Sequence, residues 1–391
     1  MAGGAAVGRL AGAASPAFEV SASLYAWELH DEGIEKILDN LQEMAAVNSV
    51  YLIALMHYEK RPFTSPEFPH NPVRKTWQAE DSRAYWIPDL KRYGRIKPRL
   101  SDFDWLNQTD WLQKLVLAVR KRGLKTGVEL SHTVLDLDRE KSDFLDCVQV
   151  GIDGQPKAVF GRAYPLCPNN PDARAYVLNL FSELASRYDV DYLQTCILPF
   201  MPGGADKGGC FCASCAKAAR EFGFDLPKAQ ASLKRKPDAQ PELAQWQEFR
   251  RSSMARYYKT MHDGIQAIRR GADLRFNDCF HGADWGLDLT RLKPHLDSIR
   301  VCDYSEQRGD PARMREKREW LTEERGAVGA DFPMLSAIAV RPKATPALIG
   351  EGIKIAAECG MNGITLGHYD GAEFPLLRAV RDGLKAAGKL S

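Results

Sequence analysis

Four cysteines have the residue type and the spacing that a zinc site requires. Cys210, Cys212 and Cys215 form a C-x-C-x-x-C segment after a glycine-rich loop, and Cys167 precedes a helix expected over residues 171–187. Thiolates offered by a tight turn can reach one tetrahedral Zn²⁺ at about 2.3 Å. Four thiolates leave no position for water, so we expect a structural Zn²⁺ ion. A disulfide is the alternative, because an exported protein could form one, although the short spacing disfavours several of the pairs.

Carboxyl groups near the ends of expected strands are the candidate catalytic groups. Glu129 lies within one strand, Asp303 lies near the end of another, and Asp370 follows a third. Burial would raise the pKa of one such carboxyl group and leave another ionised, which separates an acid from a base. We expect Glu129 and Asp303 to face each other across the mouth of a barrel. Asp303 with Asp370, or Asp303 with Glu28, are the alternative pairs.

Histidines and aromatic residues gather near the same strand ends. We interpret the histidines first as groups that bind substrate hydroxyls; acid–base catalysis and a second metal site are the alternatives. The aromatic rings suit stacking on a sugar as well as packing in a core. The expected substrate-binding residues are Trp27, Glu28, His57, Tyr58, Arg61, His70, His132, Asn277, His281, Tyr304, His368 and Tyr369.

The elements that must position these residues alternate between β-like runs and amphipathic helical runs. The expected strands are 19–27, 49–58, 125–131, 190–198, 274–280, 298–304, 333–340 and 363–369. The expected helices are 33–47, 108–122, 171–187, 243–270, 312–326, 345–359 and 373–387. Eight strands with a helix after nearly every one predict an α/β fold, a (β/α)₈ TIM barrel. A doubly wound sheet is less favoured, because no glycine-rich fingerprint opens the first βα unit.

Two insertions interrupt this alternation, after the second and fourth strands. Residues 59–102 are rich in proline, aromatic and basic residues and are too long for a plain connection, so we expect a loop that closes over a ligand. After the fourth strand comes the cysteine segment, followed by residues 228–245, which we interpret as a solvated linker. We expect residues 18–391 to form a single barrel domain that carries the catalytic groups.

Residues 1–17, MAGGAAVGRLAGAASPA, are small and poor in charge. They are typical either of the remnant of an export signal or of a disordered tail. A twin-arginine signal would place its paired arginines before Met1. We therefore expect a periplasmic or secreted protein, with a cytoplasmic one as the alternative.

Charge and hydropathy exclude two classes of partner. The net charge is +2, and charged residues of both signs, 27% of the chain, are interspersed, so no basic face for nucleic acid is indicated. No apolar run reaches the roughly 18 residues of a membrane span. A small or neutral molecule is the expected partner, and assembly into a homo-oligomer stays open.

The order of Cys167 and the C-x-C-x-x-C segment resembles the zinc site of family 42 glycoside hydrolases, the bacterial β-galactosidases. Together with CFCASC, four segments, YAWELHDEG, PHNP, IKP and LCPNNP, resemble a group of glycoside-hydrolase-like (β/α)₈-barrel proteins. This similarity covers positions 20 to 225. It implies the barrel fold, the Cys₄ zinc site, and an oligosaccharide or glycoside as substrate.

The expected reaction departs from that of the β-galactosidases. They carry a glutamate acid after the fourth strand and a glutamate nucleophile after the seventh, where this sequence has Gln194 with Thr195 and Arg341. We therefore expect a carbohydrate-active enzyme that hydrolyses glycosidic bonds with non-standard carboxylates. A sugar lyase, isomerase or epimerase that uses histidine and acidic residues, and a non-catalytic carbohydrate-binding barrel, are the alternatives.

Overall fold

A computed structural model describes most of the chain. The described residues are 18–55, 68–75, 83–130, 134–136, 141–158, 163–196, 199–279 and 285–390. The N-terminal segment interpreted above as a signal remnant or tail lies outside them. No helix in these ranges combines the length and the apolar character that crossing a membrane requires.

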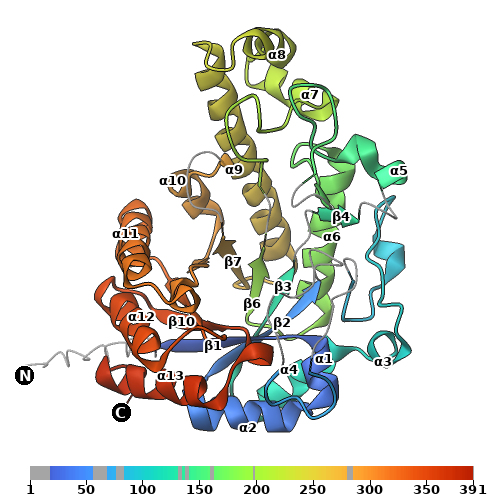
Figure 1. The fold of residues 1–391 in the computed structure, drawn as a ribbon. Helices are drawn as coiled ribbons and strands as arrows, with labels where there is room; N and C mark the ends of the chain where they lie inside the picture. Colours follow the sequence, from blue (N-terminus) through green and yellow to red (C-terminus); the bar gives the residue numbers. More distant parts are fainter. Residues whose placement is uncertain are drawn as a thin grey trace, which may run out of the picture.

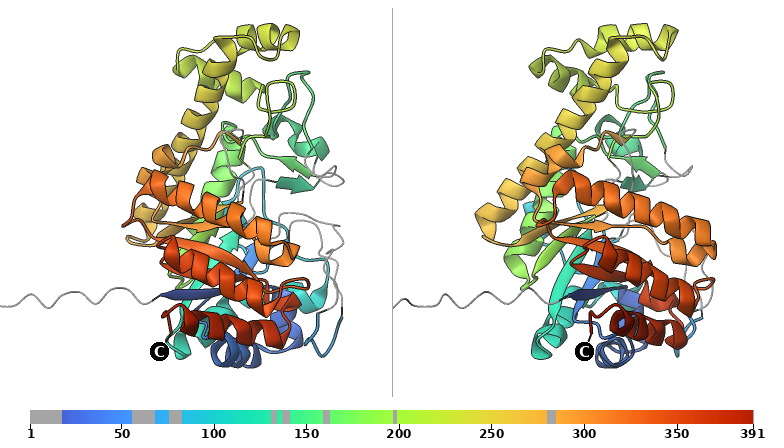
Figure 2. Two further views of the ribbon diagram at one scale, coloured as in Figure 1. Left: turned by 60° about the vertical axis from the view of Figure 1, so that its left-hand side comes forward. Right: turned by 90° about the vertical axis from the view of Figure 1, so that its left-hand side faces the viewer.

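Eight parallel strands close into a barrel, as the sequence predicts (Figures 1 and 2). They are β1 Glu19–Leu24, β2 Ser49–Leu55, β3 Lys125–Leu130, β6 Tyr192–Thr195, β7 Asp273–Asp278, β8 Ser298–Val301, β9 Met334–Ala339 and β10 Gly363–Gly367. The strands are neighbours in this order, and β10 pairs with β1. A short antiparallel pair, β4 Val134–Asp136 and β5 Ala163–Pro165, lies outside the barrel. Closure of the sheet excludes the doubly wound alternative.

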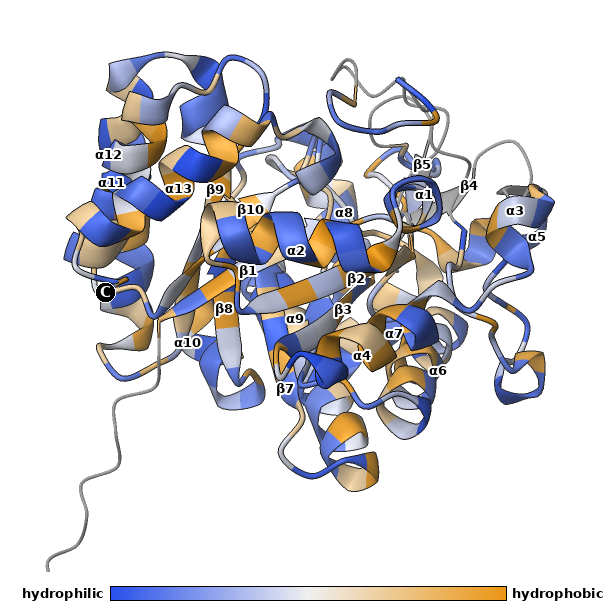
Figure 3. Ribbon diagram, turned by 90° about the horizontal axis from the view of Figure 1, so that it is seen from below, coloured by the Kyte–Doolittle hydropathy of each residue, from blue (hydrophilic) through white to orange (hydrophobic). Residues whose placement is uncertain are grey.

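Helices surround the strands, and those that pack on the barrel present an apolar side to it. They are α1 Ala26–Asp31, α2 Ile34–Ala45, α3 Asp104–Asn107, α4 Trp111–Lys121, α5 Lys141–Phe144, α6 Pro171–Arg187, α7 Ala213–Glu221, α8 Leu226–Arg235, α9 Glu242–Ile268, α10 Leu289–Leu292, α11 Pro311–Val328, α12 Pro346–Glu358 and α13 Phe374–Ala386. In α2, the buried residues Ile37, Leu38, Leu41 and Ala45 recur at helical spacing. Figure 3 shows apolar and polar residues alternating on the helices around the barrel.

Two expectations about elements are wrong. The first strand ends at Leu24 and α1 begins at Ala26, so Trp27 and Glu28 lie on a helix. Residues 228–245 are no linker, since α8 and the start of α9 occupy most of that range. Asp225 caps α8 by accepting the backbone N–H of Lys228 at 3.0 Å. A few buried apolar residues at helical spacing stabilise α8 although its composition is polar; these are Leu226, Ala229 and Leu233.

The insertion after β6 stands away from the barrel. Helices α7 and α8 and the first part of α9 extend beyond the side at which β6 ends, and the rest of α9 returns to the barrel (Figures 1 and 2). Part of the insertion after β2 instead packs on the barrel. Tyr85 donates its backbone N–H to the carbonyl of Ala54 in β2 at 2.8 Å, so this stretch extends the end of that strand.

The interior of the barrel near its amino end is an ion-paired polar layer. Arg275 of β7 donates Nη1 to Glu19 Oε1 at 2.8 Å, and its guanidinium carbon lies 3.9 Å from the ring centre of Tyr192. The hydroxyl of Tyr192 lies within 3.1 Å of the Ser21 and Ser49 hydroxyls. These groups hold β1, β2, β6 and β7 together from the inside.

Candidate functional site

The four expected zinc ligands meet in one buried cluster. Their sulfur atoms all lie within 4.8 Å of one another, and Cys167 Sγ lies 3.5 Å from the sulfurs of both Cys212 and Cys215. All nine cysteines lie in the described part of the chain, and all are free, so the structure does not form the alternative disulfide. The sequence therefore predicted the composition of the cluster correctly.

The surroundings of the four sulfurs suit thiolates. The backbone N–H of Val150 donates to Cys210 Sγ at 3.2 Å, and Asn169 Nδ2 donates to Cys215 Sγ at 3.4 Å. Burial raises the pKa of Cys167 and of Cys215, so four adjacent thiolates are unfavourable without a cation. N–H donors around four buried sulfurs are the arrangement expected for a closed tetrahedral site. The cluster can hold a metal ion.

Glu28 on α1 and Asp370, in the short turn Tyr369–Gly371 that follows β10, bring two carboxyl groups to the carboxyl end of the barrel. Their exposed fractions are 0% and 1%. The backbone N–H of Tyr25 donates to Glu28 Oε2 at 3.1 Å, and Arg341 Nη2, after β9, donates to Asp370 Oδ1 at 3.2 Å. Among the described residues, Glu28 Oε1, Asp370 Oδ2 and Arg341 Nε have no hydrogen-bond partner although all three atoms are buried. Buried polar atoms in this state are exceptional and point to a ligand or water.

The two carboxyl groups disfavour each other's ionisation. Burial raises the pKa of Glu28 well above its usual range, and the negative charge of Asp370 raises it further. Burial also raises the pKa of Asp370, and the positive charge of Arg341 opposes this rise. Because the positive charge of Arg341 acts on Asp370, ionisation is less unfavourable at Asp370 than at Glu28. The site thus brings together two buried carboxyl groups that differ in their tendency to hold a proton.

Glu129 of β3 lies inside the barrel in a second polar layer. Its Oε2 accepts a hydrogen bond from Gln194 Nε2. Burial raises the pKa of Glu129 to about 7, and the charge of Arg300 and the bond from Gln194 oppose this rise. Arg300 in turn donates to Asn277 Oδ1 at 2.6 Å and to the hydroxyl of Tyr304. Gln194, at the position where the β-galactosidase resemblance implies a general acid, here positions a neighbouring carboxyl group.

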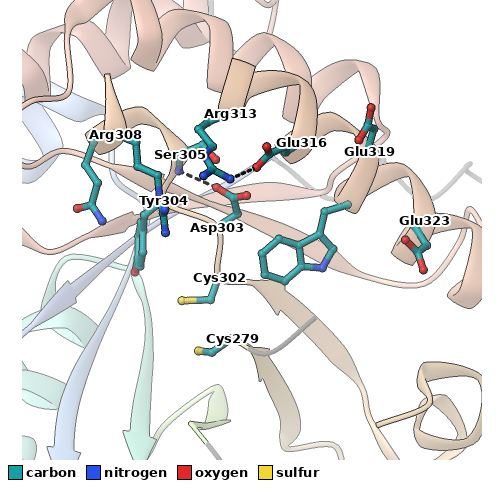
Figure 4. A pocket seen from close by; sticks show the side chains of 12 residues that line it. Cys279, Cys302, Asp303, Tyr304, Ser305, Arg308, Arg313, Glu316, Glu319 and Glu323 are labelled. Carbon is teal, nitrogen blue, oxygen red and sulfur yellow. Dashed lines mark hydrogen bonds and ion pairs between the residues drawn. The ribbon is translucent and has the colours of Figure 1, made fainter. Parts of the chain in front are cut away.

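Asp303 borders a cavity of about 500 Å³ between the ends of β7 and β8 and helix α11 (Figure 4). Its Oδ1 accepts the backbone N–H of Ser305 at 2.6 Å, and Arg313 and Glu316 form an ion pair close by. Glu129 is not among the residues that line this cavity. That Glu129 and Asp303 face each other across the barrel mouth remains a prediction from the sequence.

Two expected substrate-binding residues, Tyr304 and His368, are partly exposed near Glu28 and Asp370. His368 Nδ1 lies 2.6 Å from Ser23 Oγ, and its ring centre lies 5.2 Å from that of Tyr25. A Cβ atom on Gly367 would come within 2.2 Å of the Tyr304 hydroxyl, so glycine is required for Tyr304 to reach this position. Tyr304 and His368 therefore form part of the surface that a substrate would meet.

Other expected binding residues have structural contacts instead. His70 places one ring nitrogen 2.9 Å from Glu32 and the other 3.0 Å from the carbonyl of Tyr369, and it stacks on Phe374. The hydroxyl of Tyr369 bonds to Glu32, and Trp27 is fully buried. These three residues anchor α1 and the segment 68–75. His57, Tyr58, Arg61, His132 and His281 lie outside the described residues.

Two arginines that control the charge of this region were not expected from the sequence as functional residues. Arg300 is buried near Glu129, and Arg341, which is partly exposed, forms an ion pair with Asp370. In β8, Ser298 and Arg300 alternate with the apolar Ile299 and Val301, and this alternation is the sequence signal for an inward Arg300 side chain. Arg341 was noted only because it replaces an acid.

Comparison with known proteins supports the fold. Neither a protein-family model nor a curated protein matches the sequence. Among solved structures, the PgaB (BpsB) glycoside hydrolase domain from Bordetella bronchiseptica has a TM-score of 0.67 at 13% identity, covering 96% of this chain and 99% of that one. α-L-Fucosidase isoenzyme 2 from Paenibacillus thiaminolyticus has a TM-score of 0.63 at 15% identity, covering 95% and 49%.

A β-galactosidase of family 42, Gan42B, has a TM-score of 0.60 at 11% identity, with 96% of this chain and 58% of that chain covered. This chain spans about half the length of the fucosidase and somewhat more than half that of Gan42B. The expected likeness to glycoside-hydrolase barrels, including those of family 42, is confirmed at the level of fold.

Proposed function

We propose that the protein is a carbohydrate-active enzyme that hydrolyses glycosidic bonds at the carboxyl end of its barrel. The observation that supports this most is the buried pair of Glu28 and Asp370, in which one oxygen of each carboxyl group lacks a partner among the described residues. In TIM-barrel enzymes this end of the barrel holds the active site. Oligosaccharides or glycosides are the substrate class, in keeping with the glycoside hydrolases that share the fold.

The electrostatics suggest a role for each group. Glu28, whose pKa is raised and to which no described lysine or arginine donates a hydrogen bond, gives its proton to the glycosidic oxygen as the bond to the sugar carbon breaks. Asp370, whose ionised form the positive charge of Arg341 favours, acts on the other side as the base that takes a proton from water or as the nucleophile. Tyr304 and His368 bind the sugar hydroxyls.

The pair expected from the sequence, Glu129 with Asp303, is the competing assignment. Glu129 has a pKa of about 7, which suits a general acid at neutral pH. Asp303 lies in the cavity beside α11 and would have to act on a sugar bound there. The two assignments place the sugar at different sides of the mouth, so the variants described below separate them.

His368 favours a second candidate function, a sugar lyase or isomerase. Its ring is partly exposed, bonds to Ser23, and lies between the rings of Tyr25 and Tyr304. A histidine beside tyrosines is suited to abstract and return a proton next to a carbonyl group. A lyase would release an unsaturated sugar that absorbs ultraviolet light, and a hydrolase would release a new reducing end.

The experiment is a screen of the purified protein against oligosaccharides and aryl glycosides, with both products measured. Once an active substrate is found, Glu28→Gln and Asp370→Asn are compared with Glu32→Gln. Glu32 is the matched control, because it is a buried carboxyl group next to the same helix whose oxygens are used by His70 and Tyr369. Loss of activity in all three variants alike would contradict the assignment of Glu28 and Asp370.

The proposal includes one structural Zn²⁺ bound by Cys167, Cys210, Cys212 and Cys215. When bound, the ion would fix the loop after β6 to the segment before α6. Since all four positions would be filled by sulfur, these cysteines take no part in the reaction.

A further inference from the structure

Three further cysteines, outside the zinc cluster, follow three neighbouring strands of the barrel. Cys196, Cys279 and Cys302 come directly after β6, β7 and the end of β8, and each is partly exposed with a free thiol. They are separated by 83 and 23 positions in the sequence, and only closure of the barrel brings them to one edge. Neither the zinc site nor the proposed sugar chemistry uses them.

Cys279 and Cys302 occupy facing positions. Asp278 pairs with Val301 in the register of β7 and β8, and the backbone N–H of Cys302 donates to the carbonyl of Asp278 at 2.8 Å. The next residue on each strand is a cysteine. Figure 4 shows the two sulfur atoms on the same side of the cavity, one beside the other. Neighbouring strands lie about 4.8 Å apart, inside the range of Cα separations that a disulfide bridges.

The two thiols have different environments. Arg300 Nη1 lies 3.4 Å from Cys302 Sγ. Contact with the Cys279 thiol and the charge of Arg300 lower the pKa of Cys302 to about 6, against the effect of burial. Contacts with the thiols of Cys196 and Cys302, together with burial, raise the pKa of Cys279. One thiol is therefore ionised at neutral pH while its neighbour keeps a proton, which is the division found in reactive dithiols.

We propose that Cys302 and Cys279 form a redox-active dithiol that reacts with low-molecular-weight disulfides entering the cavity beside α11. The Cys302 thiolate attacks one sulfur of the disulfide, forms a mixed disulfide and releases one thiolate. The Cys279 thiol then loses its proton and attacks the Cys302 sulfur, which forms the intramolecular disulfide and releases the second thiolate. Two protein thiols are oxidised, and one external disulfide is reduced to two thiols.

The zinc cluster provides an internal contrast. Three of its cysteines are fully buried and Cys212 is 8% exposed. None of the four lines the cavity, whereas Cys279 and Cys302 do. Access to a disulfide reagent therefore separates the two groups of thiols. This contrast depends on the structure alone and not on the proposed sugar chemistry.

The test uses the full chain as purified, with glutathione disulfide as the probe. After exposure, remaining thiols are alkylated and the modified peptides are identified by mass spectrometry, while released glutathione is measured. We expect a disulfide between Cys279 and Cys302 and two equivalents of glutathione. Cys279→Ser should instead retain one glutathione on Cys302, and Cys302→Ser should leave Cys279 unmodified. Cys359→Ser is the matched control, a partly exposed thiol far from the mouth on α12, and it should react like the native chain.

A second measurement gives the rate. At pH 6 we expect iodoacetamide to alkylate Cys302 about tenfold faster than Cys359, the net of a larger thiolate fraction and a weaker nucleophile. Equal rates at Cys302 and Cys359, glutathione on Cys279 but not on Cys302 in the single variants, or a disulfide that joins Cys279 to Cys196 would each overturn the assignment of the two roles.

Discussion

The two ends of the barrel contain the same chemical groups in opposite states. At the amino end, Arg275 and Glu19 are both buried, and Arg275 uses all three of its guanidinium nitrogens on Glu19, Asp273 and Ser298. At the carboxyl end, Arg341 reaches Asp370 with one nitrogen, and its Nε is buried without a partner among the described residues.

The carboxyl groups at the two ends differ in their pKa values, because their arginine contacts differ. Burial raises the pKa of Glu19, but the adjacent Arg275 more than offsets it, so the pKa stays below its usual value. Glu28 is as deeply buried and has Asp370 beside it, so its pKa rises well above that value. Burial alone thus does not mark a functional carboxyl group; a buried carboxyl group without a compensating charge does. The amino end stabilises the fold, and the carboxyl end is suited to proton transfer.

The largest effect on stability is expected from breaking the ion pair between Arg275 and Glu19 at the amino end of the barrel. Arg275→Met leaves Glu19 buried with only the more exposed Lys125, whose Nζ lies 3.4 Å away, as a cationic partner. It should lower the free energy of unfolding by about 3 kcal/mol. Urea unfolding at pH 7 measures this. Arg341→Met is the control at the other end, and a smaller loss is expected there because Asp370 can take up a proton. Equal losses of unfolding free energy in Arg275→Met and Arg341→Met would mean that the two arginines have the same role.

The second effect is on turnover. Glu28→Gln and Asp370→Asn should each lower kcat by about 10²-fold or more, equivalent to about 2.7 kcal/mol. The midpoint of unfolding should stay near or above the native value, because each change keeps the size of the side chain and removes a buried ionisable group. Steady-state kinetics on the substrate found in the screen, with urea unfolding of the same samples, test this. Activity lost in Glu129→Gln and Asp303→Asn, and kept in the first two variants, would transfer the reaction to the pair expected from the sequence.

Metal removal should affect stability at a third place, away from both ends. We expect one zinc per chain by elemental analysis, and none in Cys212→Ser, with a loss of about 2 kcal/mol in unfolding free energy because the insertion loses its cross-link. The turnover number per folded molecule of this variant should equal that of the native chain. Native protein purified without chelator that contains no zinc would contradict the Cys₄ site.

The smallest effect concerns Glu129 and pH. Its pKa is about 7 in the folded chain and near 4.5 when unfolded, so the folded state holds a proton that the unfolded state releases between these values. Stability from this group therefore falls as pH rises from about 4.5 through 7. Glu129→Gln removes this titration, and we expect it to gain about 1.4 kcal/mol over the native chain at pH 8 relative to pH 6. If the difference in unfolding free energy between Glu129→Gln and the native chain did not change with pH, the raised pKa of Glu129 would be ruled out.

Much of the fold could be predicted from the sequence because it depends on local patterns. Apolar runs bounded by turn residues located all eight strands, and the spacing of Cys210, Cys212 and Cys215 indicated a shared ligand site. Helix α8 was missed because its polar composition hides three apolar residues at helical spacing. Trp27 and Glu28 were placed at a strand end because the local pattern does not show where a strand ends and a helix begins after it.

The sequence by itself determined which residues form strands, helices and the cysteine cluster, since periodicity and spacing act over a few residues. Only the tertiary structure decided that Glu28 lies against Asp370, that Arg341 lies beside one carboxyl group and not the other, and that Cys279 faces Cys302. These contacts join residues more than twenty positions apart through the closure and register of the barrel. Charge state depends on the distance and burial of such partners, and neither quantity is encoded in a local stretch of sequence.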